Sequence, residues 1–229
     1  MSHRCPSEKG NAMIYILIAL ALLGALTMIL SRQNERSSGE NMTEDMLNFE
    51  TTRMRSYAAS AQDAVNKMIM SGSSVDDLQF FLPNVASYDT GSHIHKVFHP
   101  EGGGLNPGNI DPKIFIGTDT DPSPGWYMGR FNNVGWSGTP AQDVLLVAHQ
   151  ISQPLCAKIN KDLTGSDVIP AIGGSGNLRD YLIDTALHTG GANADLTSAI
   201  CAGCDQKIAL CVSNTSGDIW SFFTVIESR

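Results

Sequence analysis

MIYILIALALLGALTMIL, residues 13–30, is the stretch from which the rest of the chain is interpreted. Its residues carry no charge, and only Tyr15, Gly24 and Thr27 interrupt the aliphatic run. As a helix rising about 1.5 Å per residue it would extend ~27 Å, close to the roughly 30 Å of a bilayer hydrocarbon core. A surface helix keeps one polar face, which this stretch lacks. We therefore expect it to insert into a membrane, either as a cleaved signal or as a retained anchor.

The residues on either side of the apolar stretch favour a retained segment. The stretch is longer than the apolar region of a conventional signal peptide, and SRQN at 31–34 is not a small-residue cleavage site. The small-residue junction with a basic residue before it lies at the front, in KGNA at 9–12. Basic residues flank both ends, so the charge bias is weak. The short polar tail before the stretch favours an N-terminus in the cytoplasm and the body of the chain outside.

This junction resembles the type III signal of type IV pilins and pseudopilins over residues 4–30, because a short polar leader ends in Gly10 directly before an apolar segment. The resemblance implies that a prepilin peptidase cuts after Gly10, so that the mature chain begins at Asn11. The retained apolar segment would be the anchor and assembly element. The side chains assigned to membrane and assembly contacts are Met13, Ile14, Tyr15, Ile16, Leu17, Leu20, Leu22, Leu23 and Leu26.

Two positions depart from the family pattern. The fifth mature residue is Tyr15, where the family usually has a Glu that helps subunits register in the filament. The first mature residue is Asn11, where Phe or Met is common. The missing Glu argues more against a major filament subunit than against the class as a whole. An ordinary single-pass anchor with a chance Gly is the alternative.

The sequence after the apolar stretch predicts an amphipathic helix. Residues 31–40 are polar and form either a hinge or a helical turn. Within residues 41–70, apolar side chains recur at spacings of three and four, and Gly72 ends the pattern. We therefore expect a leader over 1–10, a transmembrane and assembly helix over 11–30, an amphipathic continuation over 31–72 and an α+β head domain over 73–229.

The head domain is predicted to contain a small antiparallel sheet. KIFIG at 113–117 and WYMGRF at 126–131 are expected strands, whereas DVLLVAHQI at 143–151 fits either a buried strand or the start of a helix interrupted near Pro154. A β-hairpin is expected over 207–227, and its second strand is apolar on both faces, which predicts a central position. The expected fold class is α+β: a long N-terminal membrane-anchoring helix packed on a small antiparallel β-sheet head that ends in a β-hairpin.

Four cysteines follow the apolar stretch, and Cys5 precedes it. An even number beyond a membrane segment fits an oxidising compartment and two disulfides, the alternative being reduced or metal-bound thiols. We favour Cys156–Cys211 with Cys201–Cys204, because the strand that carries Cys211 could receive the helix that carries Cys156. The rival pairing joins Cys156 to Cys201 and Cys204 to Cys211.

Candidate sites for chemistry are few. His93, His95 and His99, with Glu101, could supply metal ligands, because His-x-His on a strand places both imidazoles on one face. We favour the alternative of surface histidines without a metal, near a mobile glycine-rich loop. Asp119 to Gly125 begins like a calcium loop but lacks its turn glycine. We therefore predict no catalytic set, no cofactor and no metal.

The predicted function is structural. With a formal charge of −8 and scattered Lys and Arg, the chain is not expected to bind nucleic acid. We expect a non-enzymatic subunit of a bacterial cell-envelope filament, of the type IV pilus or type II secretion pseudopilus kind. It would lie in the inner membrane as a single-pass protein with a periplasmic or extracellular C-terminal domain. Expected partners are the membrane, other pilin-like subunits in a homo- or hetero-oligomer, and prepilin peptidase. The alternatives are an unprocessed anchored binding or stalk protein and an anchored metal- or thiol-dependent enzyme.

Overall fold

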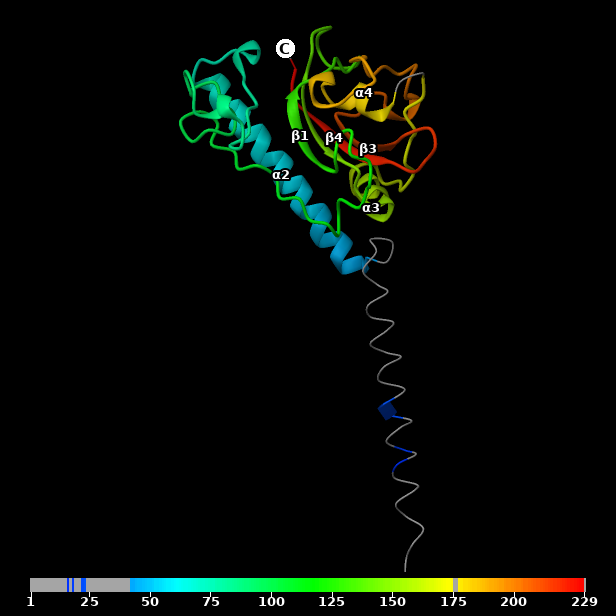
Figure 1. The fold of residues 1–229 in the computed structure, drawn as a ribbon. Coiled ribbons are helices and arrows are strands. Elements are labelled where there is room, and N and C mark those ends of the chain that lie inside the picture. Colours follow the sequence, from blue (N-terminus) through cyan, green and yellow to red (C-terminus); the bar gives the residue numbers. More distant parts are fainter. Residues whose placement is uncertain (1–15, 17, 19–21, 24–41, 175–176, 229) are drawn as a thin grey trace, which may run out of the picture. The chain divides into compact units, whose positions relative to one another are not determined.

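The computed structural model describes Ile16, Ile18, Leu22, Leu23, residues 42–174 and residues 177–228. It divides the chain into two compact units, residues 1–41 and residues 42–229. The second unit contains the sheet and the long helix shown in Figure 1. Each unit is described by itself.

A four-stranded antiparallel sheet forms the centre of the second unit. Its strands are β1 (Gly125–Arg130), β2 (Val144–His149), β3 (Ala209–Ser213) and β4 (Trp220–Glu227), in the order β1-β2-β4-β3. The predicted C-terminal hairpin is therefore present, and β4 lies between β2 and β3 as its two apolar faces require. The ambiguous segment around residue 145 is a strand, and it is buried at every position.

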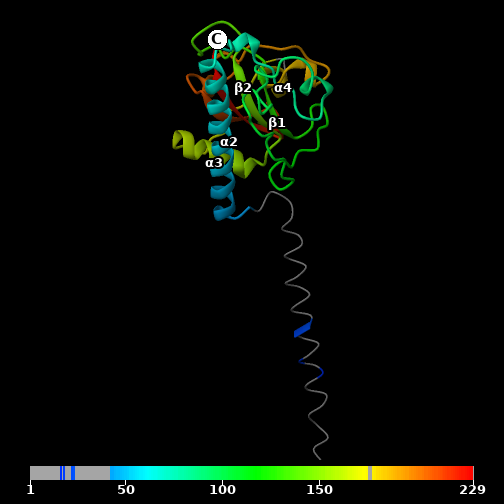
Figure 2. The same cartoon turned by 90° about the vertical axis from the view of Figure 1, so that its left-hand side faces the viewer.

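Two helices pack on one face of the sheet (Figures 1 and 2). They are α2 (Glu44–Met70) and α3 (Gln153–Thr164). Helix α2 begins after Thr43, whose side-chain oxygen accepts a hydrogen bond from the N–H of Met46 at 3.4 Å. Its buried stripe contacts the side chains of β2 and β4 that point to this face, in a cluster that includes Ala61, Ala64, Val65, Met68, Val144, Leu146 and Ile226. Helix α3 extends the same layer toward β3.

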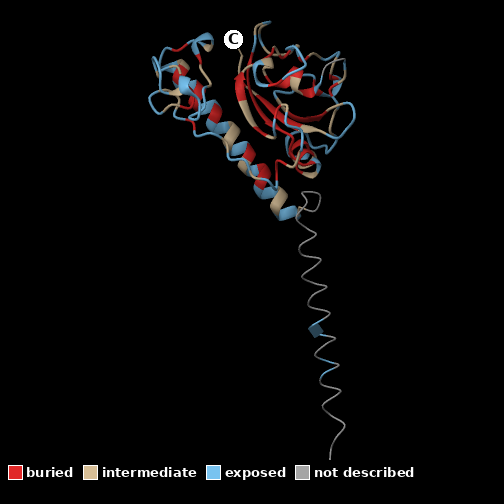
Figure 3. Cartoon of the chain, in the orientation of Figure 1, coloured by how far each residue is buried: buried red, intermediate tan, exposed pale blue. Residues whose placement is uncertain are grey.

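The opposite face of the sheet is covered mainly by non-repetitive chain and by the short helix α4 (Leu178–Leu182). This second layer includes Leu145, Val147, Leu210, Val212 and Phe223 from the sheet and Ile172, Tyr181, Leu182 and Leu196 from the covering segments. Consecutive residues of β2 therefore contact different layers, as the alternation of side chains along a strand requires. Figure 3 shows the resulting pattern, in which the strands are buried while the outer surface of α2 is exposed.

The predicted fold class is wrong in its N-terminal helix. Within the described part of the chain, no helix combines the length and the apolar character needed to cross a membrane. The long helix that packs on the sheet is α2, which has Glu44 and Asp45 in its first turn and Lys67 in its last. Its apolar stripe is already buried against the sheet, so it belongs to the head rather than to an anchor. The α+β content and the antiparallel sheet remain.

Two smaller predictions also differ from the structure. KIFIG is not a strand, because Phe115 forms only an isolated bridge with Ile151 and packs into the core beside α3. The sequence at 74–82 predicts a short helix with Ser74 as its N-cap and Pro83 as its stop. The structure has a single 3-10 turn there, Val75–Asp77, in which the Asp77 carboxylate accepts the N–H of Ser74 at 3.0 Å. The first segment thus contributes core side chains and the second a capped turn, and neither forms a regular strand or an α-helix.

Candidate functional site

The N-terminal residues predicted for processing and assembly lie mostly outside the described residues. The junction residues Gly10 and Asn11 lie there, as do Met13, Ile14, Tyr15, Leu17, Leu20 and Leu26. The remaining assembly residues, Ile16, Leu22 and Leu23, are helical and exposed. Their role in assembly stays a prediction.

The predicted disulfide pairing is confirmed. Cys156 on α3 is bonded to Cys211 on β3, and Cys201 is bonded to Cys204 across a single 3-10 turn. All four residues are buried. The first bond ties α3 to the edge strand of the sheet, whereas the second closes a short loop over the opposite layer. The oxidised C-x-x-C pair is thus part of the core and not a surface thiol site.

Three potential metal ligands come together in the loop that follows the first 3-10 turns. His93, His99 and Glu101, here called the His93 cluster, each place one ligand atom within 4.8 Å of the others. The two rings are stacked, with centroids 3.9 Å apart and planes inclined by 26°. His93 Nδ1 lies 3.2 Å from Glu101 Oε2, and the Glu101 N–H donates to His99 Nδ1 at 3.2 Å. His93 Nε2 is buried and has no hydrogen-bond partner among the described residues.

The expected His-x-His pair does not form. Residues 93–95 are in a turn instead of a strand, so the alternation rule does not apply to them. The His95 ring faces away from the cluster and lies 2.9 Å from Ser73 Oγ. A sequence reading alone could not select His99, because its approach to His93 depends on the turn between them.

The loop that carries the His93 cluster is held by backbone contacts and by a buried lysine. The ammonium group of Lys96 donates to the carbonyl oxygens of Ser87, Tyr88 and Thr90 at 2.5–2.8 Å, and Lys96 is 1% exposed. Gly102 lies so close to the backbone that a Cβ there would sit 2.2 Å from the Lys96 carbonyl oxygen. Gly103 is equally close, since a Cβ there would sit 2.5 Å from the Val97 carbonyl oxygen, so close packing requires glycine at both positions of the run expected to be mobile.

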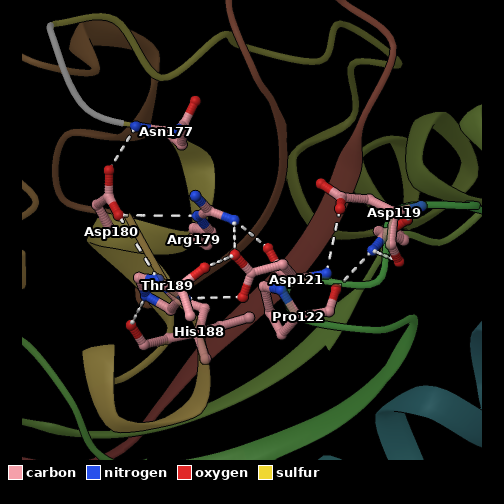
Figure 4. Close-up of polar contacts among 10 residues, drawn as sticks. Asp119, Asp121, Pro122, Asn177, Arg179, Asp180, His188 and Thr189 are labelled. Atoms are coloured by element: carbon pink, nitrogen blue, oxygen red, sulfur yellow. Dashed lines mark hydrogen bonds and ion pairs between the residues drawn. The ribbon is translucent and has the colours of Figure 1, made fainter. Parts of the chain in front are cut away.

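A second polar cluster joins two distant loops (Figure 4). The Asp121 carboxylate accepts hydrogen bonds from the N–H and the hydroxyl of Thr189, and Arg179 Nη1 lies 3.0 Å from Asp121 Oδ2. These bonds, first those from Thr189 and then the charge of Arg179, lower the pKa of Asp121. Arg179 also donates to the Asp121 carbonyl oxygen. The calcium-like sequence at 119–125 thus already has a cationic partner of its own.

Gln150 completes the attachment of this loop to the sheet. Its side-chain amide donates to the carbonyl oxygens of Asp119 at 3.0 Å and Pro122 at 2.8 Å, while its carbonyl accepts the Asp119 N–H at 3.1 Å. Gln150 follows β2 directly and adopts a positive φ of 62°. These contacts fit a structural clasp between the end of β2 and the loop.

The structure also pairs a serine with a histidine, which the sequence analysis missed. His149 on β2 and Ser221 on β4 are opposite each other in the strand register, and His149 Nδ1 lies 2.8 Å from Ser221 Oγ. A hydroxyl beside an imidazole can form a nucleophile and base pair. Here both residues are buried, and burial lowers the pKa of His149 to about 4. The pair is therefore a neutral hydrogen bond inside the sheet layer.

Comparisons of the chain with protein-family models, with curated proteins and with solved structures found no match.

Proposed function

We propose that this protein is a pilin-like structural subunit of a bacterial cell-envelope filament, with a non-catalytic role. In this proposal a prepilin peptidase cuts after Gly10, and the apolar segment that follows enters the inner membrane and later contacts the same segment of neighbouring subunits. Residues 42–229 would form the head on the outer side of that membrane. The observation that carries the proposal is the uncharged run at 13–30 placed directly behind the Lys9-Gly10 junction.

Two features of the head support this proposal. Its two buried disulfides fit a domain that folds in an oxidising compartment. Its first helix, α2, begins soon after the apolar run in the sequence. One face of α2 is buried against the sheet, so α2 is an integral part of the head. Both features also suit an unprocessed, anchored binding or stalk protein, so the decisive test concerns the N-terminus.

The test is N-terminal sequencing and intact-mass measurement of the full chain recovered from membranes of a host that contains prepilin peptidase. We expect the mature chain to begin at Asn11. The Gly10→Ala variant should keep its leader, whereas the matched Gly24→Ala variant should be processed normally. A wild-type chain that still carries its leader would refute the pilin-like proposal and favour the unprocessed alternative.

Assembly is tested separately by chemical cross-linking in intact cells. We expect a ladder of cross-linked products for the processed wild type and its loss in Gly10→Ala, because the retained leader keeps the apolar segments from packing side by side. Processing without any cross-linked product would refute the filament role while leaving the cleavage site correct.

A further inference from the structure

We propose that the His93 cluster binds a divalent transition-metal ion, with Zn²⁺ as the representative ion. Imidazole nitrogens with one carboxylate oxygen form a donor set that Zn²⁺ and its neighbours in the first transition row accept readily. The site lies in the head and goes beyond the proposed function. It does not depend on cleavage after Gly10, so either idea can fail without the other.

The distances within the cluster are close to those of a bound ion. Two ligand atoms on a tetrahedral zinc, with bonds of about 2.0–2.1 Å, lie about 3.3 Å apart. The His93 Nδ1 to Glu101 Oε2 distance is 3.2 Å, and the three residues each place one possible ligand atom within 4.8 Å of the others. The Glu101 side chain is 69% exposed, so it has room to rotate toward the rings. The two rings are stacked with planes inclined by 26°, so one ring must also rotate before both imidazoles can point at the same ion.

Backbone hydrogen bonds order the main chain that carries the two rings. The Lys96 N–H donates to the His93 carbonyl oxygen at 3.0 Å, and the N–H groups of Gly102 and Gly104 both donate to the His99 carbonyl oxygen at 2.9 Å. The buried Lys96 ammonium holds the adjoining loop. A binding site that is already ordered loses little conformational entropy when its ligand binds.

The cluster would leave part of the coordination sphere to other ligands. Three protein ligands are one fewer than a closed structural zinc site has, and the fourth position is commonly filled by water. The carboxylate of Glu101 is at the surface, and both rings are half-buried. Solvent therefore reaches the cluster at Glu101, where water could fill the open position.

The probe is Zn²⁺, titrated by calorimetry into the full chain purified in detergent without a histidine tag. The parent protein and all variants in this experiment carry His3→Ala and Cys5→Ser, because those leader residues could bind zinc on their own. We expect one Zn²⁺ per chain. His93→Ala and His99→Ala should each weaken binding at least about 100-fold, since even outer-shell changes cost about 10–100-fold.

His95→Ala is the matched control, because His95 belongs to the same loop and to the His-x-His sequence but faces Ser73. We expect it to bind zinc within about 3-fold of the parent, a change small beside the 10–100-fold cost of outer-shell substitutions. Glu101→Gln keeps an exposed side chain of the same shape, so it tests the carboxylate without risk to the fold. Circular dichroism checks that each variant is folded.

The proposal is overturned if the parent chain does not bind zinc, or if His93→Ala and Glu101→Gln bind it as the parent does. Equal losses in the His95→Ala and His99→Ala variants would also overturn it, because His95 lies outside the proposed ligand set and its removal should leave binding unchanged. Cobalt substitution gives an independent readout, since Co²⁺ bound to this set should show visible absorption bands that His99→Ala abolishes.

Discussion

The Cys156–Cys211 disulfide should contribute far more to stability than Cys201–Cys204. It joins residues separated by 55 positions, whereas the other bond joins residues separated by 3. In the chain-entropy model, closing a loop of the longer kind stabilises the folded state by about 4 kcal/mol at 25 °C, and closing the shorter one by about 1.6 kcal/mol. Replacing each pair by two alanines should therefore separate the two bonds by roughly 2.5 kcal/mol in the free energy of unfolding.

The packing around the two bonds makes this comparison a fair one. All four cysteines are no more than 1% exposed, so both double-alanine variants lose buried sulfur atoms in similar surroundings. The difference between the variants then reports mainly the length of the loop. Cys156 additionally fastens α3 to β3, so its loss should loosen the helix that covers the β3 end of the sheet.

The assay is urea unfolding of the full chain in detergent, followed by tryptophan fluorescence under oxidising conditions. Trp126 and Trp220 lie in β1 and β4, so they report on the sheet itself. The reasoning is refuted if the Cys201→Ala, Cys204→Ala variant is as unstable as the Cys156→Ala, Cys211→Ala variant. Reduction of the wild type should reproduce at least the larger of the two losses.

Three further changes test other parts of the fold. Lys96→Met should lower the free energy of unfolding by about 2–4 kcal/mol, because three carbonyl oxygens lose a charged donor. The control Lys67→Met, on the exposed side of α2, should change it little. Urea unfolding measures both variants. The pKa of His149 is about 4 in the folded protein and ordinarily 6.5, so the folded state binds fewer protons between these values. The contribution of neutral His149 to the free energy of unfolding should thus be fully present above pH 6.5 and be lost, by about 3 kcal/mol, as the pH drops toward 4. Unfolding curves measured at several pH values should show this dependence in the wild type and a weaker one in His149→Gln. Ala61→Leu should destabilise by about 1–3 kcal/mol, because Ala61 is fully buried against the sheet, while Ala59→Leu on the exposed face should be nearly neutral in thermal unfolding.

Local patterns predicted much of the head. The spacing of apolar side chains within residues 41–70 indicated a helix, and α2 spans Glu44–Met70; residues 31–41 of the predicted 31–72 helix lie outside the described residues. The apolar character of both faces of β4 indicated a central strand, because only such a strand is covered on two sides. The favoured disulfide pairing rested on a helix placed beside the strand of Cys211, and the structure has that pairing, although the sequence left a rival open.

Where prediction failed, the deciding contacts were between residues distant in sequence. KIFIG has the composition of a strand, yet it forms only the isolated bridge from Phe115 to Ile151 and buries side chains beside α3. The sequence around Asp121 resembles the start of a calcium loop, but the Asp121 carboxylate forms an ion pair with Arg179 and accepts hydrogen bonds from Thr189. The fold class was wrong where a membrane-anchoring helix was expected to cover the sheet, because α2 fills that position.

The sequence by itself determined the apolar run at 13–30, the residues able to pair as disulfides and the alternation that builds the sheet, because these depend on side chains close together in the chain. Only the tertiary structure decided which histidines meet. His-x-His predicts a pair at 93 and 95, but the turns closed by the backbone N–H groups of Lys96 and His99 bring His99 and Glu101 to His93 instead. A side chain's neighbours in a turn depend on contacts made elsewhere in the fold, which no local pattern records.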